Sequence, residues 1–259
     1  MEKTLYLSER QGMRVSRDGP SLWIVQPGQA GRRVPARLIR RVLIVGNVAL
    51  DSGSLALFAE RGVPVTLLSR QSEPVATVLG VAEGDAQRRA RQAALLEDRA
   101  RREQVAAWLS AWEHGRQLVL LTRLDPGQAS RWRREGFRRT DYDAWVVAQG
   151  RVRGLAGRAR GFFLGALHEL VVAEVGAGGW DPHVGVRHRT QPLGFVKDCV
   201  MALRAEADRL WLEGAPAEMG RASSSAAWAA RFEAGRPRVE ALLRRMLDQY
   251  AGLLWRERD

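Results

Sequence analysis

The amino-acid sequence predicts an α+β protein in which a small N-terminal β-sheet domain with a short helix precedes a mostly α-helical C-terminal domain. Short β-prone runs separated by turn residues fill the first 78 residues. Beyond residue 84, Ala, Arg, Leu, Glu and Gln dominate, and apolar residues recur at helical spacing. We therefore expect domains at 1–78 and 85–259, joined by a linker at 79–84.

Three short runs at the start of the chain are rich in residues favoured in strands, at 5–7, 13–16 and 22–25. The second and third are separated by Arg17-Asp18-Gly19-Pro20, and this composition favours a turn. We therefore expect the second and third runs to form a β-hairpin.

The next strand is predicted at 42–45, where Val-Leu-Ile-Val is apolar on both faces, as in the centre of a sheet. Asp51, Ser52 and Ser54 are then available to cap a short helix that ends near Gly62. Its expected inward residues are Leu55, Leu57 and Phe58. The chain returns as a strand at 63–68, which completes a compact sheet domain with one helix.

The C-terminal part is predicted to be helical because Leu95, Val105, Trp108, Leu109 and Trp112 follow a period near 3.6 residues. Further helices are expected at 118–124, 127–149, 158–176, 193–213 and 225–256, with breaks at Asp125-Pro126, Gly178-Gly179, Gly214 and Pro237. The serine-containing stretch 220–227 is expected to be a mobile loop or the start of a helix.

The net charge of the chain indicates which kind of partner it binds. The chain has 41 Lys and Arg against 29 Asp and Glu, a net charge of +12, and all basic residues except Lys3 and Lys197 are arginine. Basic side chains gain affinity for polyphosphates by releasing counterions, so nucleic acid is the expected partner, ahead of a membrane surface. A GC-rich genome is the alternative explanation for the arginine content, although it leaves the excess charge unexplained.

Several other functions are disfavoured. No apolar run reaches the roughly 18 residues that cross a bilayer, so we expect a cytoplasmic protein without a membrane span. The single cysteine, Cys199, excludes an internal disulfide and a cysteine-based zinc site. Gly46 stands alone where a dinucleotide fingerprint needs three glycines, and the chain contains no P-loop.

A cluster of arginines interleaved with Trp132, Phe137 and Tyr142 is the preferred candidate for DNA binding, because aromatic rings can stack on bases beside charges that contact phosphates. A solvated helix face is the alternative interpretation. The arginines of this cluster are Arg131, Arg133, Arg134, Arg138 and Arg139.

Two segments resemble the CRISPR-associated integrase family, the first of the Cas proteins. Val34-Pro35, the strand that ends at Gly46 and the later Gly62-Val63-Pro64-Val65 follow the order of that family's opening domain. Gly179-Trp180-Asp181-Pro182, followed by Val184-Gly185-Val186-Arg187-His188, is similar to the family pattern that ends in its metal-binding histidine. Asp198 stands ten residues later, and Arg204 and Asp208 continue the family's acidic-helix pattern.

The resemblance implies a metal-dependent DNA endonuclease and integrase of CRISPR adaptation, which inserts spacer DNA into the repeat array. It implies Mn²⁺ or Mg²⁺ held by His188, Asp198 and a first carboxylate, and these residues would also be catalytic. Glu135, in the Glu135-Gly136 pair, is similar to the family's first carboxylate at the start of a helix. The implied partners are double-stranded and branched DNA, a second copy of the chain, and a small second adaptation protein.

One residue departs from the family pattern. The family's helix carries two acids three residues apart, and the second is a metal ligand, whereas Met201 stands three residues after Asp198 here. A thioether is a poor substitute for a carboxylate toward a hard cation. The sequence therefore leaves two hypotheses open: a metal-dependent enzyme with an altered site, or a catalytically impaired member that binds DNA or serves as a structural subunit.

Overall fold

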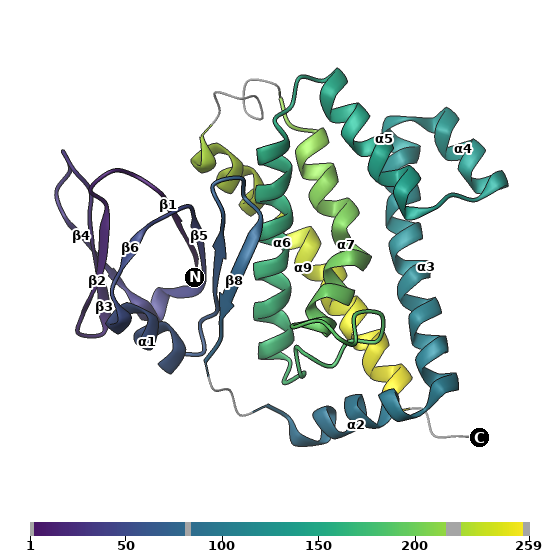
Figure 1. Cartoon of the computed structure of the whole chain (residues 1–259), viewed down its shortest axis with the longest axis horizontal. Coiled ribbons are helices and arrows are strands. Elements are labelled where there is room, and N and C mark those ends of the chain that lie inside the picture. The colour runs from purple at the N-terminus through teal and green to yellow at the C-terminus, as the bar shows by residue number, and fades with distance from the viewer. Residues whose placement is uncertain (1–2, 81–83, 216–223, 256–259) are drawn as a thin grey trace. The chain divides into compact units, whose positions relative to one another are not determined.

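The computed structural model describes residues 3–80, 84–215 and 224–255 (Figure 1). The chain divides into two compact units, residues 1–83 and 84–259. Within the predicted linker at 79–84, residues 81–83 lie outside the described part.

The N-terminal unit contains two four-stranded sheets. The first has the order β1 (Lys3–Ser8), β5 (Ile39–Val45), β7 (Val65–Leu68) and β8 (Pro74–Val78), in which β8 alone runs antiparallel to its neighbour. The second has the order β4 (Arg32–Pro35), β3 (Ser21–Val25), β2 (Arg14–Asp18) and β6 (Ala49–Leu50).

The predicted hairpin is confirmed, because β2 and β3 pair antiparallel with Asp18 opposite Ser21. The central strand is also confirmed: β5 lies between β1 and β7, and its residues 42–45 are buried. The predicted cap is present in α1 (Ser52–Glu60), where Asp51 Oδ1 accepts a hydrogen bond from the Ser54 N–H at 2.7 Å. The hydrogen bonds from Ser54 lower the pKa of Asp51.

Three short strands were not predicted, namely β4, β6 and β8. β4 reads Arg-Arg-Val-Pro and β6 has two residues, so neither carries an alternating apolar pattern. They exist because the neighbouring strands of the sheets offer backbone hydrogen bonds, which periodicity within one strand does not report.

The C-terminal unit is helical in its described residues, which confirms the α+β fold class. Its helices are α2 (Ala86–Glu97), α3 (Arg99–Leu124), α4 (Pro126–Glu135), α5 (Arg139–Val152), α6 (Gly157–Ala177), α7 (Gly194–Leu212) and α9 (Ser225–Trp255). α6 is buried nearly all round and packs against α7 and α9, while α7 also packs against α3.

Three helix predictions were wrong. The separate helix predicted at 118–124 is the last part of α3, which runs unbroken from Arg99 to Leu124. The helix predicted at 127–149 is two helices, because Gly136 takes a φ of 74° and ends α4. The break predicted at Pro237 is absent, because α9 continues through it with Phe232 and Val239 buried on either side. Packing of the apolar face of a helix can offset the hydrogen bond that a proline removes. Of the stretch 220–227, residues 220–223 lie outside the described part, and α9 begins at Ser225.

Candidate functional site

The segment between α6 and α7, residues 178–193, folds back over the first turn of α7. The Phe195 N–H donates to the Pro182 carbonyl at 3.0 Å, and the backbone passes so close to α7 that a Cβ on Gly185 would lie 2.3 Å from the Gly194 carbonyl carbon. Glycine at both positions therefore permits the close approach that brings His188 to α7.

Asp198, in the second turn of α7, is the hub of this site. Its side chain is fully buried, and its Oδ1 lies 2.7 Å from the His188 Nδ1. Its Oδ2 accepts hydrogen bonds from the backbone N–H groups of Val186 at 2.6 Å and Arg187 at 3.1 Å. The carboxylate thus holds three consecutive residues of the segment, and it leaves Nε2 as the imidazole nitrogen that faces away from Asp198.

A second carboxylate reaches the same segment from α3. Glu113 is only 3% exposed, and its Oε2 lies 2.8 Å from the Arg187 Nη1. Its Oε1 accepts a hydrogen bond from the Gln117 Nε2 at 3.4 Å. Glu113 was not predicted as a site residue, although its place on the apolar stripe of α3, four residues after Leu109, is a signal in the sequence.

Glu135 is not brought to this site. It is the last residue of α4, its side chain is 61% exposed, and it forms an ion pair with Arg131 of the same helix at 3.7 Å. In Figure 1, α4 lies beside one end of α3, whereas the green segment between α6 and α7 lies toward the other end. The Glu-Gly pair ends α4 here instead of starting a helix, and α5 begins only at Arg139.

The residues present do not fit a divalent ion of the Mn²⁺ or Mg²⁺ type. Within the described residues, no three His, Cys, Asp or Glu side chains converge as a group that could hold a metal. Both oxygens of Asp198 and both oxygens of Glu113 already have partners, and Met201 places a thioether on the same helix face as Asp198. Hard cations require several oxygen ligands, and this set leaves one imidazole nitrogen.

Helix α2 holds the segment from its other side. Gln92 is fully buried, and its amide exchanges two hydrogen bonds with the backbone of Asp181, at 2.8 Å and 3.3 Å. Arg88 donates to the Gly178 carbonyl and lies over the Trp180 ring. These contacts fix the backbone at the start of the segment, which has no regular secondary structure.

The predicted DNA-binding arginines are exposed on α4 and α5. Arg131 and Arg138 form ion pairs with Glu135 and Asp141. Arg133 donates to the Thr122 hydroxyl at 2.6 Å. In the described part of the chain, no ion pair is found for Arg133, Arg134 or Arg139, so the guanidinium charge of these three is unbalanced.

The aromatic residues of that cluster do not form the expected stacking surface. Trp132 is buried and stacks on Phe137, with ring centroids 4.6 Å apart. Tyr142 is also buried, and its hydroxyl donates a hydrogen bond to Asp208 Oδ2 at 3.0 Å. The other oxygen of Asp208 accepts a hydrogen bond from Arg160 Nε at 2.7 Å. Burial and the charge of Asp208 raise the pKa of Tyr142. Both rings pack inside the helical unit, so arginine charge is what remains for nucleic acid.

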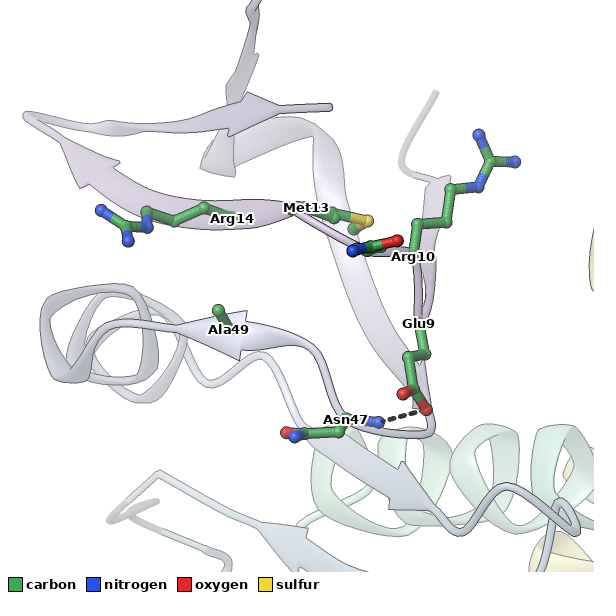
Figure 2. Close-up of a pocket in the computed structure, with 8 residues that line it drawn as sticks. Glu9, Arg10, Met13, Arg14, Asn47 and Ala49 are labelled. Atoms are coloured by element: carbon green, nitrogen blue, oxygen red, sulfur yellow. Dashed lines mark hydrogen bonds between the residues drawn. The ribbon is translucent and has the colours of Figure 1, made fainter. Parts of the chain in front are cut away.

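The N-terminal unit has a separate cavity of about 410 Å³, shown in Figure 2. At its base, the Asn47 backbone N–H donates to the Glu9 carboxylate at 3.1 Å. None of the predicted site residues lines this cavity, whose lining residues are Glu9, Arg10, Gln11, Gly12, Met13, Arg14, Asn47 and Ala49.

Comparison with solved structures shows the same fold over nearly the whole chain. A CAS1 protein from Thermotoga maritima is 14% identical and aligns over 100% of both chains with a TM-score of 0.80. TtCas1 in a complex with DNA is 18% identical, with a TM-score of 0.63 over 99% of this chain and 93% of that one. A casposase bound to an integration product is 15% identical, with a TM-score of 0.62 over 92% and 82%.

No significant match is found among curated protein sequences. In the described residues, no helix is long and apolar enough to cross a membrane. A family model described as CRISPR associated protein Cas1 matches residues 5–142, more than half of the 259 residues, and it agrees with the resemblance carried by the N-terminal strands. Because this match and the fold of the whole chain agree, the protein belongs to the Cas1 family of CRISPR-associated proteins.

Proposed function

We propose that this protein is a DNA-binding member of the Cas1 family that serves CRISPR adaptation as a structural subunit without metal-dependent catalysis. The observation that carries the proposal is Met201, which stands where the family has an acid. In the same region, the carboxylate of Glu113 is paired with the Arg187 guanidinium. Met201 offers no carboxylate oxygen and the ion pair occupies a buried carboxylate, whereas metal-dependent catalysis needs a divalent ion to stabilise charge on the phosphodiester.

DNA binding is the part of the activity that the remaining residues support. The net charge of +12 and the exposed arginines of α4 and α5 favour a phosphate backbone as the partner. TtCas1, which shares the fold, was solved with DNA. Following the family, we expect the protein to act in the cytoplasm as a homodimer on double-stranded and branched DNA, with a small second adaptation protein.

A second candidate is the metal-dependent endonuclease and integrase that the family resemblance implies. The observation in its favour is the His188 ring, which the buried Asp198 orients through Nδ1 so that Nε2 faces away. A casposase of the same fold was solved with an integration product. This function would require Arg187 to leave Glu113 and Mn²⁺ or Mg²⁺ to be bound without an acid at position 201.

Cleavage and strand transfer on a branched DNA, with and without Mn²⁺, distinguish the two candidates. The native protein, His188→Ala and Met201→Asp are compared, and His183→Ala is the matched control because His183 is an exposed histidine of the same segment. We expect no product from the native protein, and DNA affinity that Mn²⁺ does not change.

A Mn²⁺-dependent product from the native protein that is lost in His188→Ala and kept in His183→Ala would establish the integrase function instead. Failure of the native protein to bind duplex or branched DNA at low salt would contradict both candidates, because both rest on the basic surface.

A further inference from the structure

We infer that a cluster of arginines around the buried carboxylate of Glu206 is a second phosphate-binding surface, which contacts the backbone of a nucleic acid. The inference rests on the proposed function and goes beyond it, because that function assigns DNA binding to the arginines of α4 and α5. The Glu206 cluster lies on α3, α7 and α9, and its arginines are Arg116, Arg209 and Arg238.

Three helices bring positive charge to one carboxylate. Glu206 of α7 is 2% exposed, and α7 packs against both α3 and α9 (Figure 1). Its Oε2 accepts hydrogen bonds from Arg209 Nε at 3.0 Å and from Arg238 Nε at 3.1 Å. Its Oε1 lies 3.8 Å from Arg116 Nη1. A single buried carboxylate thus has a guanidinium from each of the three helices beside it.

The ion pairs of this cluster leave positive charge in excess. A buried carboxylate needs one compensating cation, and Glu206 has three. Arg209 also pairs with Glu213 at the C-terminal end of α7, and Glu213 pairs with Arg123 of α3 at 2.7 Å. Four arginines against two glutamates leave a net charge of +2.

A neighbouring arginine of α9 shows the opposite balance. Arg236 lies 2.8 Å from Glu233 and 2.6 Å from Glu240, so two acids surround one guanidinium. Arg238 instead shares the carboxylate of Glu206 with two other arginines, and its side chain is 49% exposed. A guanidinium presents several N–H donors in one plane, and a shared carboxylate uses only part of them. Arg238 therefore keeps donors at the surface for an incoming anion.

The arrangement fits the phosphates of an extended polyanion. Guanidinium pairs with phosphate bidentately, and side chains that Glu206 already orders lose less freedom when a ligand binds. The cluster also continues toward the predicted arginines, because Thr122, next to Arg123, accepts a hydrogen bond from Arg133 of α4 at 2.6 Å. Positive charge spread over several helices favours a nucleic acid backbone over a single ion, since each phosphate contact adds affinity by releasing counterions.

The test measures the affinity of the full chain for a labelled duplex at several salt concentrations. Arg238→Gln and Arg236→Gln are a matched pair, because each removes one positive charge from α9. Each phosphate contact contributes about 0.9 to the slope of log affinity against log salt. We expect Arg238→Gln to reduce the slope by about 1 and Arg236→Gln to keep the native slope.

The double variant Arg116→Gln with Arg238→Gln should reduce the slope by about 2. Arg209 remains beside Glu206 in this variant, so the buried carboxylate keeps a cation. If the double variant does not fold, Arg123→Gln decides, because its side chain is 63% exposed and its loss should reduce the slope by about 1.

A folded double variant with the native slope would overturn the inference while the native chain still binds DNA as proposed. Equal changes in Arg238→Gln and Arg236→Gln would also overturn it, because they would show a general effect of net charge. Failure of the native chain to bind the duplex at low salt would instead contradict the proposed function.

Calorimetry with inorganic phosphate at constant ionic strength separates a nucleic acid from a free ion. We expect no saturable binding, because a backbone gains its affinity from several phosphates bound at once. Saturable binding that the double variant loses, together with an unchanged slope for DNA, would make a small phosphate-bearing ligand the occupant and overturn the assignment to nucleic acid.

Discussion

At the scale of single residues, two buried carboxylates have different roles that depend on their partners. Asp198 accepts two backbone N–H groups and faces His188 Nδ1, so its charge stabilises the local backbone. Glu113 instead accepts a hydrogen bond from the Gln117 side chain and pairs with the guanidinium of Arg187 from another part of the chain. Both carboxylates are buried and hydrogen-bonded, and neither is therefore an open ligand.

His168 in α6 makes the stability of the protein dependent on pH. Burial, together with the positive charge of Lys197, lowers the pKa of His168 from 6.5 to about 4. Between these two values the unfolded chain takes up a proton that the folded chain does not, so stability is fully present above pH 6.5 and falls as the pH drops. We expect a loss of about 2 kcal/mol from this group at pH 5.

The measurement is the urea midpoint at neutral pH and at pH 5 for the native protein and His168→Leu. The variant lacks the titrating group, so its acid-induced loss should be smaller by the amount given above. His114→Gln, which changes an exposed histidine of α3, is the control and should show the native loss. Equal losses in the native protein and His168→Leu would contradict the assignment.

At the scale of elements, helix periodicity predicted most helices, but it did not detect where backbone conformation interrupts them. One helix was expected over 127–149, whereas the break at Gly136 depends on a backbone conformation with positive φ. Pro237 shows the opposite case, in which a residue that usually ends helices lies inside α9. At Gly136 the backbone conformation outweighed the predicted periodicity. At Pro237 packing outweighed the helix-breaking propensity of proline.

A matched pair of glycines tests the break between α4 and α5. A Cβ at Gly136 or at Gly115 would meet nothing within 4 Å, so the two sites differ in backbone conformation: Gly136 has a φ of +74° and Gly115 lies inside α3. We expect Gly136→Ala to destabilise the protein by about 1 kcal/mol, because an L-residue is strained there. Gly115→Ala should stabilise it by about 0.5–1 kcal/mol.

Chemical denaturation of the two variants and the native protein gives these differences directly. If Gly136→Ala proved as stable as the native protein, the left-handed turn would not be what ends α4, and a continuous helix over 127–149 would have to be reconsidered.

At the scale of the whole molecule, the excess of arginine is the strongest indication of a polyanionic partner. On α4 and α5, acids neutralise Arg131 and Arg138, while Arg133, Arg134 and Arg139 have no ion pair within the described residues. We expect Arg133→Ala, Arg134→Ala and Arg139→Ala in one chain to reduce the slope of log affinity against log salt by about 2–3, since each phosphate contact contributes about 0.9.

Fluorescence anisotropy of a labelled duplex at several salt concentrations measures this slope. The double variant Arg131→Ala with Arg138→Ala is the control and should change the slope less, because its charges are already balanced by Glu135 and Asp141. A triple variant with the native slope would place the DNA-binding surface elsewhere on the molecule.

The sequence by itself determined the α+β architecture, the β2–β3 hairpin, the central strand, most helices and the family. These features depend on composition and on patterns that repeat within a few residues. The motif from Gly179 to His188 could also be found because its residues are contiguous in the sequence. His188 and Asp198 could be placed in one site from the sequence because both match positions of the family pattern.

Only the tertiary structure decided which buried carboxylate pairs with Arg187, next to His188 in the sequence. The Glu-Gly pattern pointed to Glu135, but the packing of α3 against α7 places Glu113 beside Arg187. The packing of helices that are distant in sequence decides which residues form a buried ion pair. A desolvated charge needs a compensating partner, and only the folded core places one beside it. Local pattern carries no information about that partner.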